Sequence, residues 1–301
     1  MNEFQEAFRN DFGHILKARP GLAGCRDLKM FSQIFNAELF RSCEFSFRNL
    51  AEGEFEIAAE AKDAYFPARV EHFLEFAGAS RESMAEYRRT ASLLDYRGMI
   101  VKAGFSDERC SSFSVYFRRE IDAAALARIS GERIEEESLA QYSRLFGNGI
   151  FFAGVDMVPF KVVPYIIQSH RLDRTVSAFA AFAGRTGEKA FEESVRLMNM
   201  LTKNDVFISF SPDERKIKAD FMNVPATAAF KVVKDLGLST EDFKRALEFA
   251  VFMGTKSFYY FSIASRAGSL SAKYYFKRFY SAGGDVSGVI ADQLERISLL
   301  K

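Results

Sequence analysis

The sequence has no tryptophan, only three cysteines and only three histidines among its 301 residues. Cys25, Cys43 and Cys110 are an odd number, lie far apart and form no CxxC pair, so neither a disulfide framework nor a zinc site is indicated. No 18 apolar residues run together, and residues 1–20 carry acids without an apolar run. We therefore expect no transmembrane helix, no signal peptide and a cytoplasmic location.

The sequence also lacks an excess of charge of either sign, with 41 basic against 40 acidic residues. Such a balance produces no net field for nucleic acid or an anionic membrane, so we expect neither as a partner. A bound anion would have to be held by a local cluster of basic side chains. Phenylalanine, in contrast, is abundant at 33 residues, and 48% of the chain is hydrophobic, which is enough for a sizeable core.

Five segments have the pattern of β-hairpins, in which two alternating or β-rich runs flank a short polar or Gly/Pro turn. They begin at residues 43, 97, 149, 205 and 255, so a unit of about 50 residues recurs along the chain. Between the hairpins, apolar residues return to helical spacing, usually as two short helices with a break. Two helices precede the first hairpin, and one helix, over about 286–299, follows the last.

The segment after the fourth hairpin carries the clearest helix signals. "ATAAFKVVKDLG" ends at Gly237, and "STEDFKRALEFAVFMG" begins with a Ser/Thr cap and acids in its first turn. Phe243, Leu247, Ala250 and Val251 follow at helical spacing and predict a buried face.

Hairpins joined by helices that all cover the same sheet face can close into a ten-stranded antiparallel β-barrel with the helices outside. We therefore predict an α+β fold of five αββα repeats. No linker divides residues 1–301, which predicts a single domain. The alternative is an open antiparallel sheet whose polar face meets solvent. Five equal units favour closure.

Alternation within the hairpins separates an apolar from a polar face. In "RCSSFSVYFRRE", Phe113 and Val115 would face the helices, and Tyr116 and Arg118 the opposite side. The basic residues collected on the polar face of the five hairpins are Arg48, Arg118, Lys161, Lys216, Lys218, Lys273 and Lys277. Its acids are Glu44, Glu54, Glu56, Glu60 and Asp220. A closed barrel would be aromatic and locally basic inside.

A helix-hairpin-helix unit repeated five times over about 300 residues resembles the ABBA-fold prenyltransferases, whose ten-stranded barrel holds a prenyl diphosphate and its acceptor. Three motifs look most like the cyanobactin branch, which prenylates peptides. "CEFSFR" resembles its first strand, with Glu44, Ser46 and Arg48 in the recurring positions, and "KAGFSDERCSSFSVYFR" resembles its second hairpin. "AKYYFKR" resembles its last strand, in which Lys277 follows two aromatic residues.

The small-molecule aromatic prenyltransferases are similar at "GVDMVPFKVVPYI", with Lys161 at a position that they use near the diphosphate, and at Lys273, their final-strand lysine. The chain also departs from the family. Ser114 stands where the relatives carry a lysine that contacts the diphosphate. Glu60 stands near the sequence position at which the peptide-prenylating branch carries an arginine. Glu56 stands where the magnesium-dependent enzymes carry an aspartate.

The resemblance implies transfer of a dimethylallyl or geranyl group from its diphosphate to a nucleophilic side chain of a peptide. Two alternatives stay open: a small phenolic or indolic acceptor, and a barrel that binds a lipid or prenyl group without chemistry. A third alternative is an open α+β fold that serves as an interaction scaffold.

In the prenyltransferase interpretation, Glu44 is the base and Glu56 a ligand of Mg²⁺, which the diphosphate would bring as a cofactor. Glu44 could instead pair with Arg48, and the tyrosines could simply fill space. The residues expected to contact the prenyl diphosphate are Arg48, Arg118, Lys161, Lys218, Lys273, Lys277, Tyr116, Tyr165 and Tyr275.

Overall fold

The structure is a computed structural model that describes residues 3–36, 39–47, 54–93, 95–106, 109–117, 122–131, 136–137, 139–140, 152–157, 160–168, 196, 206–211, 216–266, 269–279 and 287–298. Its helices are α1 (Glu3–Ala18), η1 (Pro20–Gly24), α2 (Arg26–Ile34), α3 (Phe66–Phe76), α4 (Arg81–Leu93), η3 (Tyr96–Gly98), α5 (Ala123–Ser130), α9 (Ala226–Asp235), α10 (Thr240–Phe252) and α11 (Ser287–Ser298). Its strands are β1 (Leu39–Phe47), β2 (Glu54–Glu60), β3 (Met99–Ser106), β4 (Arg109–Phe117), β5 (Phe152–Met157), β6 (Phe160–Gln168), β7 (Val206–Ser211), β8 (Lys216–Pro225), β9 (Ser257–Arg266) and β10 (Ser269–Phe279).

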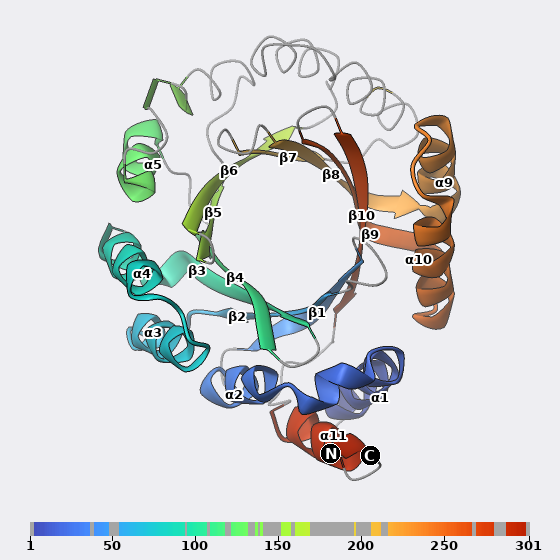
Figure 1. Cartoon of the computed structure of the whole chain (residues 1–301), viewed down its shortest axis with the longest axis horizontal. Coiled ribbons are helices and arrows are strands. Elements are labelled where there is room, and N and C mark those ends of the chain that lie inside the picture. Colours follow the sequence, from blue (N-terminus) through green and yellow to red (C-terminus); the bar gives the residue numbers. More distant parts are fainter. Residues whose placement is uncertain are drawn as a thin grey trace.

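The ten strands in the described part of the chain form one antiparallel sheet that closes into a barrel. Each strand pairs with its neighbours in sequence, and β1 also pairs with β10, with Glu44 opposite Lys277. Figure 1 shows the resulting ring with the helices around its outside. The predicted antiparallel hairpins with helices outside are thus present. The segment 170–202, where helical spacing is expected between the third and fourth hairpins, lies outside the described residues, apart from residue 196.

The outer face of the barrel is apolar because alternate strand residues point toward the helices. Phe55 and Ile57 of β2 and Phe113 and Val115 of β4 are buried in the core. The ring of Phe73 on α3 packs on Phe113, with centroids 5.4 Å apart. Burying a phenylalanine side chain stabilises the fold by about 1.5–3 kcal/mol. The core therefore lies between the sheet and the helices.

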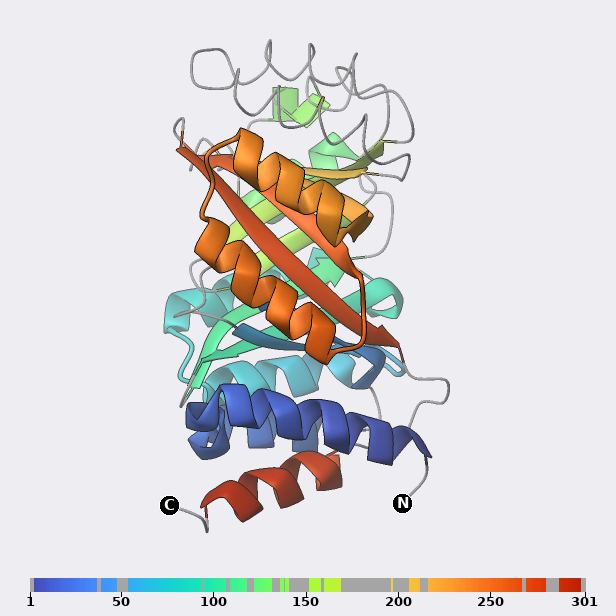
Figure 2. The same ribbon diagram turned by 90° about the vertical axis from the view of Figure 1, so that its right-hand side faces the viewer.

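Helices α9 and α10 lie against the outside of the barrel, as Figure 2 shows. Their break follows the predicted signals: Gly237 has a φ of 63°, and Ser239 caps α10 by accepting a hydrogen bond from the amide of Asp242 at 3.1 Å. Phe243 is buried as predicted. Val251 is 70% exposed, so its place in the predicted buried face is wrong. It lies at the margin of the apolar stripe, on the side that turns to solvent.

The two ends of the described chain lie at the same end of the molecule (Figures 1 and 2). Helix α11 packs against α1, η1 and α2, and Arg9 of α1 forms an ion pair with Asp292 of α11 at 2.9 Å. None of the helices that the structure describes is long and apolar enough to cross a bilayer.

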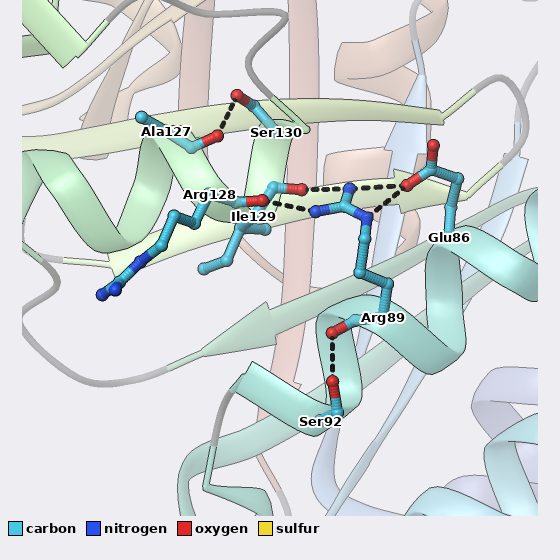
Figure 3. A network of polar contacts seen from close by, with 7 residues as sticks. All are labelled: Glu86, Arg89, Ser92, Ala127, Arg128, Ile129 and Ser130. Carbon is cyan, nitrogen blue, oxygen red and sulfur yellow. Dashed lines mark hydrogen bonds and ion pairs between the residues drawn. The ribbon is translucent and has the colours of Figure 1, made fainter.

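Arg89 of α4 holds the C-terminal end of α5 (Figure 3). Its guanidinium donates hydrogen bonds to the carbonyls of Arg128 and Ile129 and to the carboxylate of Glu86. The last carbonyls of a helix lack intrahelical partners, and a cation there also favours the helix dipole. Arg89 therefore ties two helices of the outer layer together.

We expect Arg89→Met to lower the free energy of unfolding by about 1–3 kcal/mol, because it removes the charged hydrogen bonds to the helix-end carbonyls and to Glu86. Urea unfolding at neutral pH measures the change. Arg97→Met is the matched control, because Arg97 is an exposed arginine that pairs with Asp95 two residues away. A loss for Arg89→Met no larger than that of Arg97→Met would contradict the role of Arg89.

Candidate active site

The inner face of the barrel is polar and buried. Among the described residues, those on this face that are polar or tyrosine and at most 8% exposed are Glu56, Ser114, Ser209, Asp220, Ser262 and Tyr275. A polar face turned to solvent would leave such side chains exposed. The polar faces of the hairpins therefore line the interior, and the open-sheet alternative is wrong because β1 pairs with β10.

Glu56 of β2 lies between two lysines of other strands. Its Oε2 is 3.3 Å from Nζ of Lys102 on β3, and its Oε1 is 3.5 Å from Nζ of Lys273 on β10. Burial by itself would raise the pKa of Glu56, but the charges of Lys102 and Lys273 and the hydrogen bond from Lys102 outweigh it and lower the pKa to about 2. Glu56 is therefore ionised at neutral pH and bridges the two ammonium groups.

Three lysines meet around the ring of Tyr275 on β10. The ammonium groups of Lys273, Lys218 and Lys102 lie 4.8, 5.7 and 6.0 Å from its centroid. Tyr275 also contacts Tyr260 of β9 edge to face, with centroids 6.0 Å apart. The face of an aromatic ring attracts cations, so Tyr275 helps to hold positive charge in a buried place. We call Glu56, Lys102, Lys218, Lys273 and Tyr275 the lysine cluster.

Lys218 has its own carboxylate partner on β8. Its Nζ lies 2.8 Å from Oδ2 of Asp220, two residues along the same face, and the hydroxyl of Ser262 on β9 donates to Oδ1. Asp220 is buried, so this pair is largely shielded from solvent. Asp220 therefore orients Lys218 toward the cluster.

Tyr116 of β4 extends the cluster toward β5. The ammonium of Lys102 lies 5.6 Å from its ring centroid. Burial raises the pKa of Tyr116, so the phenol stays protonated at neutral pH. Ser114, two residues earlier on the same face, donates its hydroxyl to Asp156 of β5 and lies directly opposite Lys102 in the register of β3 and β4.

A second aromatic contact lies further along β10. The ammonium of Lys277 is 5.0 Å from the ring centroid of Tyr259 on β9. Glu44 of β1 is the register partner of both Lys277 and Glu56. The backbone thus places Glu44 between a basic residue and an acidic residue at the edge of the cluster.

The barrel brings together several of the residues that the sequence singles out. Those in contact with one another or with the same lysine are Glu56, Tyr116, Lys218, Lys273 and Tyr275. The backbone register places Glu44, Lys161 and Tyr165 on the inner face, while their side chains lie outside what the structure describes. Arg48 and Arg118 lie outside the described residues. Lys216 lies at the start of β8, opposite Arg266 in the register.

Sequence reasoning missed Lys102 and Asp156. Lys102 lies in the strand "MIVKAGFS", in which Met99, Val101 and Ala103 are buried on the outer face. That alternation was a usable signal, because it puts Lys102 on the face opposite to the apolar residues. A lone lysine in an apolar run shows no charge pattern of its own, and only the register with β2 brings it to Glu56.

The surroundings of Glu56 do not fit a magnesium ligand. Each of its carboxylate oxygens faces an ammonium group, whereas Mg²⁺ requires oxygen ligands in a near-octahedral arrangement. Within the described ranges, no three His, Cys, Asp or Glu side chains are grouped so that they could hold a metal ion. Glu56 instead fixes the positions of Lys102 and Lys273.

Solved structures with a similar fold include the crystal structure of 6-dimethylallyltryptophan synthase from Micromonospora olivasterospora in complex with DMASPP and Trp. The TM-score is 0.54 and the identity 15%, over 78% of this chain and 80% of that chain. A second structure, of a 6-dimethylallyl tryptophan synthase, matches with the same TM-score and identity over 78% of this chain and 79% of that chain. No protein-family model and no curated protein matches the sequence. The likeness extends to the fold and does not single out the cyanobactin branch.

We expect Glu56→Gln to be less stable than the wild type at neutral pH, because two half-buried ammonium groups lose their buried carboxylate partner. Since the pKa of Glu56 in the folded protein is below its ordinary 4.5, its contribution is present above about pH 4.5 and is lost as the pH falls toward 2. The difference in free energy of unfolding should therefore shrink between about pH 5 and about pH 3.

Urea unfolding at a series of pH values measures this difference. Glu136→Gln, at an exposed position of the described chain, is the control for loss of one carboxylate. A difference between wild type and Glu56→Gln that stays constant across the acidic range would show that Glu56 is not a buried ionised partner of the lysines.

Proposed function

We propose that the protein is a prenyltransferase that moves a dimethylallyl group from its diphosphate to a small aromatic acceptor. The observation that carries the proposal is the lysine cluster, which gathers three ammonium groups around Tyr275 on the inner face of the barrel. The likeness of the fold to a synthase solved with DMASPP and Trp supports it.

The cluster suits a diphosphate leaving group. When the allylic C–O bond breaks, the electron pair and the negative charge go to the diphosphate oxygen. Fixed cations in a site shielded from water stabilise that charge most strongly. In the proposal Lys218 and Lys273 bind the diphosphate, together with Lys161, Lys277, Arg48 and Arg118 as the resemblance implies.

The tyrosines suit the positive charge that develops on the allylic carbon. The allylic carbon becomes cationic as the diphosphate leaves, and aromatic ring faces stabilise a cation while excluding water. Tyr116 and Tyr275 are on the inner face at the lysine cluster, and burial raises the pKa of Tyr116, which keeps its hydroxyl neutral at pH 7. Tyr165 shares this role in the proposal through its register position on β6.

Glu44 is the proposed base. The acceptor ring forms a bond to the allylic carbon, and the proton that the ring then releases passes to the carboxylate of Glu44. Glu56 is unsuited to this task, because a carboxyl group with a pKa of about 2 is a weak base. The magnesium ion that the resemblance implies would enter with the diphosphate, and no step here depends on it.

The acceptor class is the point at which the proposal departs from the sequence interpretation. The motifs favour a peptide side chain, but the similar solved structures are tryptophan-modifying synthases, one of them bound to Trp. We therefore propose an indolic or phenolic small molecule as the acceptor. A barrel that binds a prenyl diphosphate without turning it over is the second candidate, because Glu56 already partly neutralises two of the three lysines.

Incubation of the protein with dimethylallyl diphosphate and a panel of tryptophan, other indoles, phenols and cyclic peptides tests the proposal. We expect diphosphate release together with a prenylated aromatic product, and a loss of activity of at least about tenfold in Lys273→Met. Lys231→Met, on the outside of the barrel in α9, is the control for lysine loss. Binding of dimethylallyl diphosphate without product would support the non-catalytic barrel, and product from peptides alone would contradict the aromatic acceptor.

We expect Glu44→Gln to reduce kcat by about 10²- to 10⁴-fold, because the amide cannot accept the ring proton. Binding of dimethylallyl diphosphate should change much less. Single-turnover rates and equilibrium titrations on the same preparation separate the two effects. An unchanged kcat would exclude Glu44 as the base.

A further inference from the structure

Lys102 is a basic residue on the inner face of the barrel to which neither the sequence motifs nor the resemblance assigns a role. It lies in the middle of β3, with its side chain 19% exposed. In the register of the sheet it is opposite Ala58 of β2 on one side and Ser114 of β4 on the other. Its neighbours in the sheet are therefore β2 of the first hairpin and β4 of the second hairpin.

The ammonium of Lys102 is surrounded by the groups of the lysine cluster. It lies 3.3 Å from Glu56 and near the rings of Tyr116 and Tyr275, at 5.6 and 6.0 Å from their centroids. Lys273 contacts the other oxygen of Glu56, so one carboxylate serves two ammonium groups. Glu56 therefore divides its single negative charge between the two lysines.

Like charges that meet in a buried site repel each other, and the cost of their desolvation is high unless anions compensate them. Lys218, with Asp220 beside it, adds a third ammonium at the same tyrosine ring. An anion with several oxygen atoms can accept hydrogen bonds from more than one ammonium at once. The arrangement therefore suits a polyanion such as a diphosphate better than a chloride or a single carboxylate.

Ser114, the register partner of Lys102, indicates what Lys102 contributes to the inner face. Its side chain is short, buried and hydrogen-bonded to Asp156, so β4 presents a hydroxyl group and no positive charge at this position of the inner face. Lys102, its direct register partner on β3, supplies an ammonium at the same level of the barrel. We propose that Lys102 binds the diphosphate and provides from β3 the positive charge that position 114 lacks. This inference rests on the proposed function, because it takes a prenyl diphosphate as the ligand.

Isothermal titration of dimethylallyl diphosphate, and separately of inorganic pyrophosphate, tests the role of Lys102. We expect Lys102→Met to weaken both affinities by about tenfold to a hundredfold, the effect of losing a hydrogen bond from a charged donor. Lys231→Met, which removes an exposed lysine of α9, should leave both unchanged. Equal affinities of Lys102→Met and Lys231→Met, with the wild type binding normally, would overturn the inference and leave the proposed function intact.

A sharper test moves the positive charge from position 102 to position 114, its register partner on β4. In the double variant Lys102→Met/Ser114→Lys, we expect the affinity for pyrophosphate to recover most of the loss, because an ammonium is again present at that level of the wall. A loss without recovery would mean that Lys102 acts through Glu56 rather than through its own charge, and would overturn the inference. If the wild type binds neither pyrophosphate nor dimethylallyl diphosphate, the proposed function itself fails.

Removal of Lys102 leaves Glu56 with fewer partners, so Lys102→Met could fail to fold. In that case Glu56→Gln is compared with Glu56→Gln/Lys102→Met, in which residue 56 carries no charge that needs Lys102. The same difference of about tenfold or more in pyrophosphate affinity is expected between these two proteins. Equal affinities would again overturn the role of Lys102. Urea unfolding of each variant verifies that the compared proteins are folded.

Discussion

The pairing of β1 with β10 determines how side chains are arranged throughout the barrel. It closes the sheet, so that one face of every hairpin packs on helices and the other turns inward. Charged side chains on the inner face lose much of their contact with water and need partners within the barrel. In the part of the barrel that the structure describes, Glu56 between Lys102 and Lys273, and Asp220 beside Lys218, meet this need.

The same constraint gives the inner face its chemical character. Ammonium groups from three strands meet around one tyrosine ring, and a carboxylate of very low pKa holds two of them in place. Such a cluster favours an anion with several oxygens, and the aromatic rings beside it favour an apolar or cationic group. A prenyl diphosphate combines both, which is why the proposed function and the proposed role of Lys102 follow from one arrangement.

Part of the site could be predicted from local pattern. Period-two alternation correctly put Glu56, Lys218, Lys273 and Tyr275 on the polar face of their hairpins. The partner of Glu56 could not be predicted that way: an expected magnesium ligand turned out to lie between two ammonium groups. Lys102 stayed unnoticed because its strand is otherwise apolar and its partner is 46 residues away in sequence. Register, rather than composition, joins them.

Local sequence patterns are enough to predict the hairpins, the helix ends such as Gly237 and Ser239, and which side chains share a face, because these depend on neighbours a few residues apart. The enclosure of the polar face, and the identity of the charges that meet there, follow from the closed barrel and not from local pattern. Closure pairs the first strand with the last, and the register around the ring sets which side chains lie opposite each other. Electrostatic partners are therefore a property of the closed barrel, since charges interact through space and not along the chain.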